Sequence, residues 1–212
     1  IYYLCKMKYK IPDKDEVIKR SKLHPSRVKA IFGFGSRVYE TASYDSDWDW
    51  IIIANTSIPN QEIRSGDFNI HVMTQDGFMN CLKEHKTSQV EAFMAPDEFR
   101  LLEDIDIDWK VNIPSLRHSF SHTSSNSWVK AKKKMMQDDY YIGVKSLFHS
   151  LRIPMFGIQI ATSGYIHDFT EANWIYDKIL SKPNWKWNDL DEEFREIRNK
   201  VSSDFRFVTQ KF

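Results

Sequence analysis

The stretch that decides the fold reads FGFGSRVYETASYDSDWDW and occupies residues 32–50. It begins inside an apolar run, residues 28–34. This run predicts a buried strand that ends at the glycines Gly33 and Gly35. It ends inside a second apolar run, WDWIIIA at residues 48–54, which predicts another strand. Further along the chain, the alternating segment 68–74 (FNIHVMT) predicts a third strand. The first half of the chain is therefore rich in strands joined by short turns.

Helical patterns surround this strand-rich centre. Acidic residues after Pro12 predict a helix that runs to about residue 24, and the acidic stretch 101–108 predicts a surface loop. After Pro114 almost every segment has helical periodicity, and four helices are predicted, at residues 128–136, 140–151, 171–180 and 190–201. We therefore expect an α+β fold with a short mixed β-sheet flanked by helices, followed by a C-terminal helical unit. The two domains are predicted at residues 1–110 and 111–212.

Composition is that of a globular chain. The 212 residues are 42% hydrophobic and 28% charged, and no apolar run approaches the ~18 residues that a membrane helix needs. The two cysteines, Cys5 and Cys81, form no disulfide framework and no metal-ligand spacing, which indicates a reducing compartment, the cytoplasm. The net charge of +1 conceals a basic segment between Arg117 and Arg152, with seven Lys or Arg against two Asp. Such a segment suits phosphates, although a solvated helix face has the same composition.

The chemistry-bearing residues lie on both sides of the turn in the quoted stretch. Asp47 and Asp49 are two apart on a predicted strand, so their carboxylates point to the same side. Like charges this close repel unless a cation lies between them, and two carboxylates with phosphate oxygens are the environment that Mg²⁺ prefers. Gly35 and Ser36 offer backbone amides and a hydroxyl that can bind phosphate. Either pair alone would predict only a tight turn or a surface strand, but together they predict a metal and phosphate site.

The spacing Gly35-Ser36, ten residues, Asp47-Trp48-Asp49 resembles the signature of the polymerase-beta-type nucleotidyltransferase superfamily, in particular its minimal-nucleotidyltransferase branch. The resemblance covers roughly residues 28–80. It implies a nucleotidyltransferase fold that moves a nucleoside monophosphate from a nucleoside triphosphate to an acceptor hydroxyl, with release of pyrophosphate. Mg²⁺ or Mn²⁺ would be the cofactor, and ATP is the favoured donor because the small members of the superfamily often use it.

The superfamily ordinarily supplies a third carboxylate from a later strand, and the matching position here is Asn69. An asparagine carbonyl is a weaker metal ligand than a carboxylate, so Asn69 would hold the metal that activates the attacking hydroxyl more weakly than an aspartate would. Asp67 lies two residues earlier and would supply the third carboxylate if the strand had a different register. Glu62 is a weaker candidate. His71, on the same strand face, is a candidate general base.

Helix lysines often hold the triphosphate in this superfamily. Lys130 and Lys134 fall on one predicted helix face, and Lys145 falls on the next helix. The resemblance therefore implies nucleotide contacts for Lys130, Lys134 and Lys145, by position and residue type and not by a defined motif.

Two other functions are open. With Asn69 in place of a carboxylate, the chain is alternatively a degenerate module that binds a nucleotide or a partner without chemistry. Arg117 and His122 have the spacing of helical RNase domains, but serines and threonines at residues 119–127 are poor helix formers, which argues against nuclease activity. The acceptor hydroxyl is left open among a protein side chain, an RNA 3′ end and a small molecule.

Overall fold

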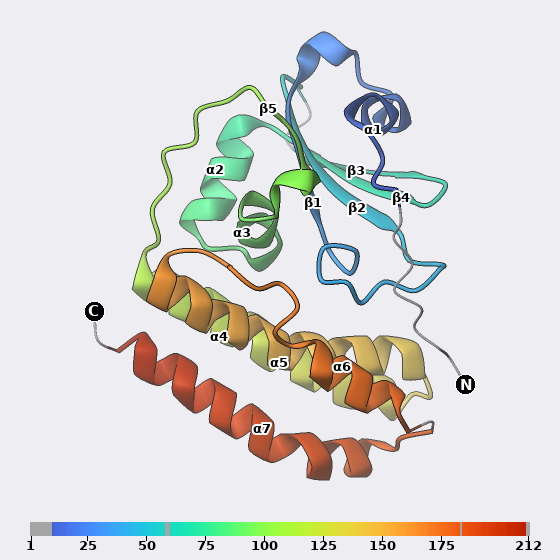
Figure 1. Ribbon diagram of the computed structural model, residues 1–212, viewed down its shortest axis with the longest axis vertical. Coiled ribbons are helices and arrows are strands. Elements are labelled where there is room, and N and C mark those ends of the chain that lie inside the picture. Colours follow the sequence, from blue (N-terminus) through green and yellow to red (C-terminus); the bar gives the residue numbers. More distant parts are fainter. Residues whose placement is uncertain (1–9, 58–59, 183, 211–212) are drawn as a thin grey trace. The chain divides into compact units, whose positions relative to one another are not determined.

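The computed structural model describes residues 10–57, 60–182 and 184–210. The chain divides into two compact units, Ile1–Trp109 and Lys110–Phe212 (Figure 1). A five-stranded mixed sheet with flanking helices forms the first unit, and helices form the described part of the second. The α+β fold class predicted from the sequence, with its short mixed sheet, is confirmed.

The sheet has the strand order β3-β4-β2-β1-β5. Its five strands are β1 (Val28–Phe34), β2 (Trp48–Ala54), β3 (Asn60–Ser65), β4 (Phe68–Met73) and β5 (Arg100–Glu103). Only β2 and β4 pair in parallel, and every other neighbouring pair is antiparallel. The three central strands match the predicted ones. Neither edge strand was predicted. The stretch expected to be a loop at 101–108 begins within β5. Its pairing with β1, such as Leu102 with Ile31, is a contact between residues far apart in sequence, which local patterns do not reveal.

Helices cover the two faces of this sheet (Figure 1). They are α1 (Lys14–Ser21), α2 (Gln75–Lys83) and α3 (Thr87–Phe93), with short 3₁₀ helices at Pro25–Arg27 and Asp97–Phe99. Phe32 of β1 stacks on Phe78 of α2 and meets Phe93 of α3 edge-on, at 5.8 and 6.4 Å between ring centres. On the other face, Arg20 of α1 lies 4.9 Å over the ring of Phe68. Strands buried on both faces explain the continuous apolar runs in the sequence.

The strand register decides which face carries the aspartates. Phe32 pairs with Ile51 and Phe34 with Asp49, so residues 32, 34, 49 and 51 share one face. Because Phe32 packs on α2 and α3, Asp49 belongs to the face that these two helices cover.

The described residues of the second unit form four helices: α4 (Ile113–Met135), α5 (Tyr140–Ser163), α6 (Asn173–Leu180) and α7 (Trp187–Val208). Two sequence predictions are wrong here. The Ser/Thr-rich stretch before Trp128 is continuous helix, because Ser124 packs inward and its hydroxyl donates to the Ser150 carbonyl at 2.6 Å. Helix α5 does not end at Leu151 but runs through Pro154, and its inner turns are buried on nearly every side. Packing has overridden local propensity.

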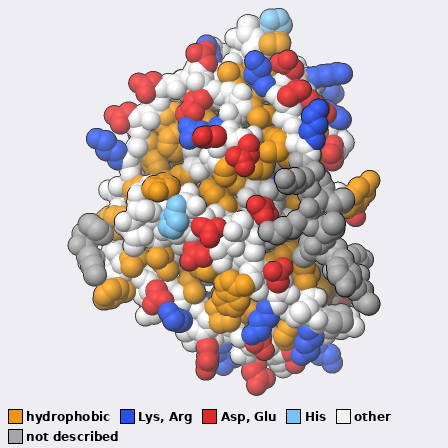
Figure 2. Space-filling view, in the orientation of Figure 1, with side chains coloured by type: hydrophobic (Ala, Val, Ile, Leu, Met, Phe, Trp, Pro, Cys, Tyr) orange, Lys and Arg blue, Asp and Glu red, His pale blue; other side chains and the backbone are white. Residues whose placement is uncertain are grey.

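The core of the second unit joins all four helices. Its larger members are Trp128 of α4, Phe148 of α5, Ile175 of α6 and Phe194 of α7. In the described part of the chain, no helix combines the length and hydropathy of a membrane span. Acidic and basic side chains intermingle over the face shown in Figure 2, as the small net charge suggests.

Candidate functional site

The parallel pairing of β2 with β4 places Asp49 directly beside Asn69. The Asn69 Nδ2 donates a hydrogen bond to Asp49 Oδ1 at 3.0 Å. This contact also fixes the orientation of the amide, because a carboxylate accepts and cannot donate. The other amide atom, Asn69 Oδ1, is buried and has no hydrogen-bond partner among the described residues. The site therefore holds a buried acceptor that lacks a donor or a cation.

Gly35 closes against this pair from the end of β1. It has a φ of +84°, and a Cβ built on it would overlap Asp49 Oδ2 and lie 3.1 Å from Asp49 Cγ. Only glycine therefore allows both the backbone conformation and the close approach of the carboxylate. The predicted helical turn after Gly35-Ser36 is present as successive hydrogen-bonded turns, in which the Gly35 carbonyl accepts from Val38 N at 3.0 Å. The half-buried Ser36 makes no side-chain hydrogen bond with a described residue.

Arg37 connects this turn to the start of β2. Its guanidinium lies 4.2 Å over the ring of Trp48 and donates to the carbonyl of Ser46. The turn is also anchored to α3, because the Tyr39 hydroxyl donates to the buried carboxylate of Glu91. Sequence reasoning missed both anchors. Arg37 directly follows Gly35-Ser36, which was the one sequence signal for the first anchor. Its partner Trp48 lies eleven residues further along the chain, so the sequence did not reveal the pair.

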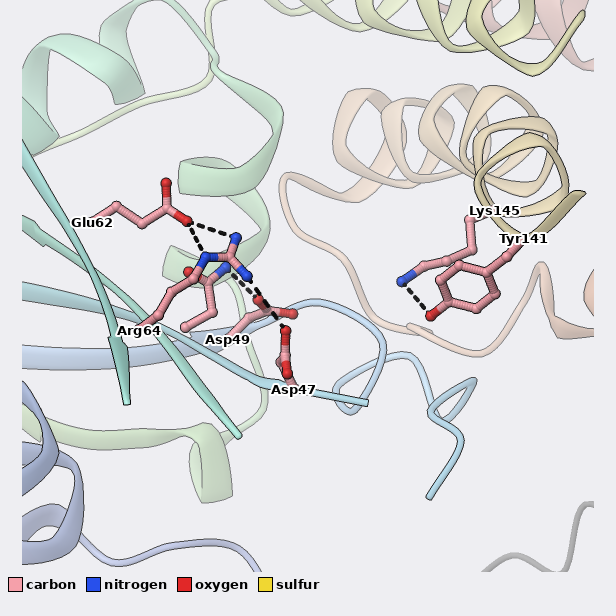
Figure 3. Close-up of polar contacts among 7 residues, drawn as sticks. Asp47, Asp49, Glu62, Arg64, Tyr141 and Lys145 are labelled. Carbon is pink, nitrogen blue, oxygen red and sulfur yellow. Dashed lines mark hydrogen bonds and ion pairs between the residues drawn. The ribbon is translucent and has the colours of Figure 1, made fainter. Parts of the chain in front are cut away.

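Asp47 directly precedes β2 with an exposed side chain and has a cationic neighbour, Arg64 of β3. Arg64 Nη1 is 3.9 Å from Asp47 Oδ2, and its Nη2 is 2.7 Å from Glu62 Oε1 (Figure 3). Arg64 pairs with Asn69 in the ladder, so Phe34, Asp49, Asn69 and Arg64 form one transverse row across four strands. The cation expected near the aspartates is thus supplied in part by Arg64. Sequence reasoning missed it because β3 was not predicted.

The remaining candidates of the first unit border this centre but make other contacts. Asp67 is in the turn between β3 and β4 with an exposed side chain, and its carbonyl accepts from Trp48 N at 2.7 Å. The His71 ring lies edge-on to Phe34, with 5.8 Å between ring centres. Cys5 lies outside the described residues, and burial raises the pKa of the Cys81 thiol. No three His, Cys, Asp or Glu side chains of the described ranges gather as a metal site, so Asp67 does not complete one with the two strand aspartates.

The predicted nucleotide-binding lysines belong to the second unit. Lys130, Lys145, His149 and Arg152 form a basic cluster across α4 and α5. Burial, followed by the charges of Arg152, Lys145 and Lys130, holds the pKa of His149 well below its usual range. Lys145 Nζ lies 3.2 Å from the Tyr141 hydroxyl (Figure 3).

Lys134 has a different environment from the other two lysines. Its Nζ donates to Asp139 Oδ2 at 2.9 Å, and this hydrogen bond lowers the pKa of Asp139. The same carboxylate accepts from Ile142 N and so caps α5. Lys134 is thus engaged within the hairpin of α4 and α5, whereas Lys130 is exposed.

The two residues of the RNase-like spacing lie on one helix. Arg117 and His122 are both in α4, so the helix propensity argument against them is wrong. They are five positions apart, about 140° around the helix axis, and so do not share a face. His122 instead stacks on His118, with 6.2 Å between ring centres.

The sequence matches no protein-family model and no curated protein. One solved structure that it resembles is the crystal structure of a nucleotidyltransferase-like protein from Exiguobacterium sibiricum 255-15, with 10% identity over 93% of this chain and 73% of that chain, and a TM-score of 0.33. From a likeness of this level we infer neither the function nor any site residue.

Proposed function

We propose that the protein is a metal-dependent nucleotidyltransferase, which moves a nucleoside monophosphate from a nucleoside triphosphate to an acceptor hydroxyl and releases pyrophosphate. AMP is the favoured group and the cytoplasm the proposed compartment. The acceptor hydroxyl belongs to a protein, an RNA end or a small molecule, and the proposal does not choose between them. Asp47, Asp49 and Asn69 are the proposed catalytic centre, Gly35 and Ser36 the triphosphate loop, and Lys130, Lys134 and Lys145 further phosphate contacts.

The observation that carries this proposal is the convergence of Gly35, Asp49 and Asn69 at one point of the sheet. The glycine backbone approaches the Asp49 carboxylate so closely that no larger residue fits. The Asn69 Oδ1 beside it is buried without a partner among the described residues, which costs free energy unless a ligand supplies a donor or a cation. A simple surface turn would need neither feature.

These residues fit Mg²⁺ or Mn²⁺ as a resident cofactor. Mg²⁺ takes one or two protein carboxylates and completes its octahedron with waters and substrate phosphates, so Asp47, Asp49 and the Asn69 carbonyl suffice. Asp67 is a further candidate ligand only if its exposed side chain turns toward Asp47. The ion would neutralise triphosphate charge and polarise the phosphoryl group.

The protein's own residues would position and stabilise. The acceptor oxygen bonds to the α-phosphorus while the bond from that phosphorus to the bridging oxygen breaks, and the hydroxyl proton passes to solvent. Backbone amides after Gly35 and the Ser36 hydroxyl would donate to phosphate oxygens, where charge develops. Arg37, held on Trp48, keeps this loop in register with Asp47 and Asp49. The site works mainly by positioning and charge stabilisation.

The test is a thermal shift with each of the four nucleoside triphosphates, with and without Mg²⁺ or Mn²⁺, followed by pyrophosphate release from the best donor. A ligand at ~100 times its dissociation constant adds about 2.7 kcal/mol of stability. We expect a metal-dependent shift that is lost in Asp47→Asn and in Asp49→Asn. Asp76→Asn, an exposed aspartate of α2 beyond the other end of β4, is the matched control and should keep the shift. No shift with any nucleotide, or an equal shift in all variants, would contradict the proposal.

One observation favours the alternative, a degenerate module that binds nucleotide or a partner without chemistry. The Asn69 amide already occupies one Asp49 oxygen, where a third carboxylate would leave that oxygen to a metal. Asn69→Asp separates the two functions. Pyrophosphate release that rises at least tenfold from a barely detectable level would indicate a degenerate site, whereas a loss from a measurable rate would establish asparagine as the working residue.

A further inference from the structure

A cavity of about 330 Å³ lies within the helical unit, remote in sequence from the aspartates. Three helices line it: α4 contributes serines, α5 contributes Pro154, and α7 contributes two arginines and a serine. These serines and arginines are Ser121, Ser124, Ser125, Arg198, Ser202 and Arg206. The lining includes no carboxylate. The cavity therefore has hydroxyl and guanidinium donors and a positive charge.

The cavity is built into the packing of the unit. Pro154 lacks an N–H, so the Ser150 carbonyl one turn before it loses its partner within the helix. The Ser124 hydroxyl crosses from α4 and donates to that carbonyl at 2.6 Å. Phe205 is fully buried and forms an apolar wall, because Gly157 lets it approach so closely that a Cβ there would lie 2.6 Å from the Phe205 ring.

The two arginines of this cavity form no ion pair with acidic side chains of the described residues, although the charge of Asp191 acts on Arg198. Within the described ranges, neither Arg198 nor Arg206 forms an ion pair with a carboxylate, and the nearby Asp191 pairs with Arg195. Arg198 is half-buried with its guanidinium 4.6 Å from the Trp128 ring centre, and burial lowers its pKa. Arg206 Nε donates to the Ser202 carbonyl at 3.2 Å. Arg206 is exposed, but Arg198 is partly desolvated and no described carboxylate is paired with it. A bound anion would stabilise such a guanidinium.

The spacing of the donors suits a tetrahedral anion. Arg198, Ser202 and Arg206 fall at i, i+4 and i+8 on one face of α7, and Ser121 and Ser125 fall at i and i+4 on α4. Donors thus reach the cavity from two helices, which a phosphate with three terminal oxygens can satisfy better than a planar carboxylate. A volume of about 330 Å³ is at the lower end for small-molecule sites and exceeds the needs of one phosphate.

We propose that this cavity binds a small organic phosphate, up to the size of a mononucleotide, with its phosphate between Arg198, Arg206 and the hydroxyls of Ser121, Ser125 and Ser202, and its organic part against Phe205. The inference does not depend on the transferase activity. No metal is required, because the charge is balanced by guanidinium groups.

Calorimetric titration of the full chain in EDTA tests the site, with inorganic phosphate, AMP, adenosine and acetate as probes. We expect AMP to bind, inorganic phosphate to bind more weakly, and adenosine and acetate not to bind. AMP affinity should fall at least about tenfold in Arg198→Gln and in Arg206→Gln, since each loses a charge-assisted hydrogen bond. Arg195→Gln, the same change on α7 at a residue outside this cavity, should alter affinity less than about twofold.

Further variants keep the outcome unambiguous. Ser125→Ala, at an exposed lining residue, tests the α4 side without removing a core contact. Asp49→Asn should leave AMP binding in EDTA unchanged, which distinguishes this cavity from the proposed metal site. Absence of heat with phosphate and AMP, equal binding of adenosine, or equal losses in Arg195→Gln and Arg198→Gln would overturn the proposal.

Discussion

Replacing Gly35 by alanine tests the closest approach in the candidate site. The added Cβ would overlap Asp49 Oδ2, and the backbone has a φ of +84°. The left-handed conformation costs an alanine about 1–2 kcal/mol. The carboxylate must also move, which weakens its 3.0 Å hydrogen bond from Asn69 by about 1.5 kcal/mol at this half-buried position. We therefore expect Gly35→Ala to lower the free energy of unfolding by about 3 kcal/mol.

The chain offers a matched control in Gly164. It has nearly the same φ, +86°, but a Cβ there would meet no atom within 4 Å. Gly164→Ala should therefore show the conformational cost alone, about 1–2 kcal/mol. Urea unfolding of both variants, and of Gly35→Ala combined with Asp49→Ala, isolates the steric part. The double variant should recover about 1 kcal/mol or more relative to additivity. If Gly35→Ala is no less stable than Gly164→Ala, the proposed contact with Asp49 is wrong.

Two further predictions concern the helical unit. Ser124→Ala leaves the Ser150 carbonyl without its donor and should destabilise by about 1–3 kcal/mol in urea unfolding, whereas the exposed Ser125→Ala should stay within about 0.5 kcal/mol; equal effects would refute the role of the hydroxyl. Because the folded pKa of His149 is lowered by burial and by Arg152, the unfolded state binds more protons as the pH falls below the usual histidine value of about 6.5. The free energy of unfolding should therefore decrease as the pH is lowered from about 7.5 to about 5, and it should decrease less in His149→Gln. An identical pH dependence in the two proteins would contradict this role of His149.

The central strands could be predicted because burial on both faces makes them apolar throughout. Strand β3 could not, because NQEIRS is a mostly exposed edge strand whose sequence resembles a loop. Helix α4 was mispredicted for the opposite reason. Its serines and threonines have poor helix propensity, but contacts such as Ser124 with the Ser150 carbonyl come only from tertiary packing.

The candidate site follows the same division. The period of a strand predicts a shared face for Asp47 and Asp49, and this stays a prediction because β2 begins only at Trp48. The position of Asn69 beside Asp49 follows once β2 and β4 pair in register. Arg64 reaches Asp47 only because an unpredicted strand lies on the far side of β4. Arg37 meets Trp48 by closing a loop whose conformation no local pattern specifies.

Strand β3 has a consequence for the association of this protein with itself. Among the described residues it is an edge strand of the sheet, and the outer side of an edge strand is a template on which another chain can add a strand. Its charged side chains, Glu62 and Arg64, are exposed on that strand and oppose such pairing. Arg64 thus contacts Asp47 in the candidate site and also opposes the pairing of β3 with a strand of another molecule. An apolar residue at position 64 should promote aggregation through β3 even where the fold is retained.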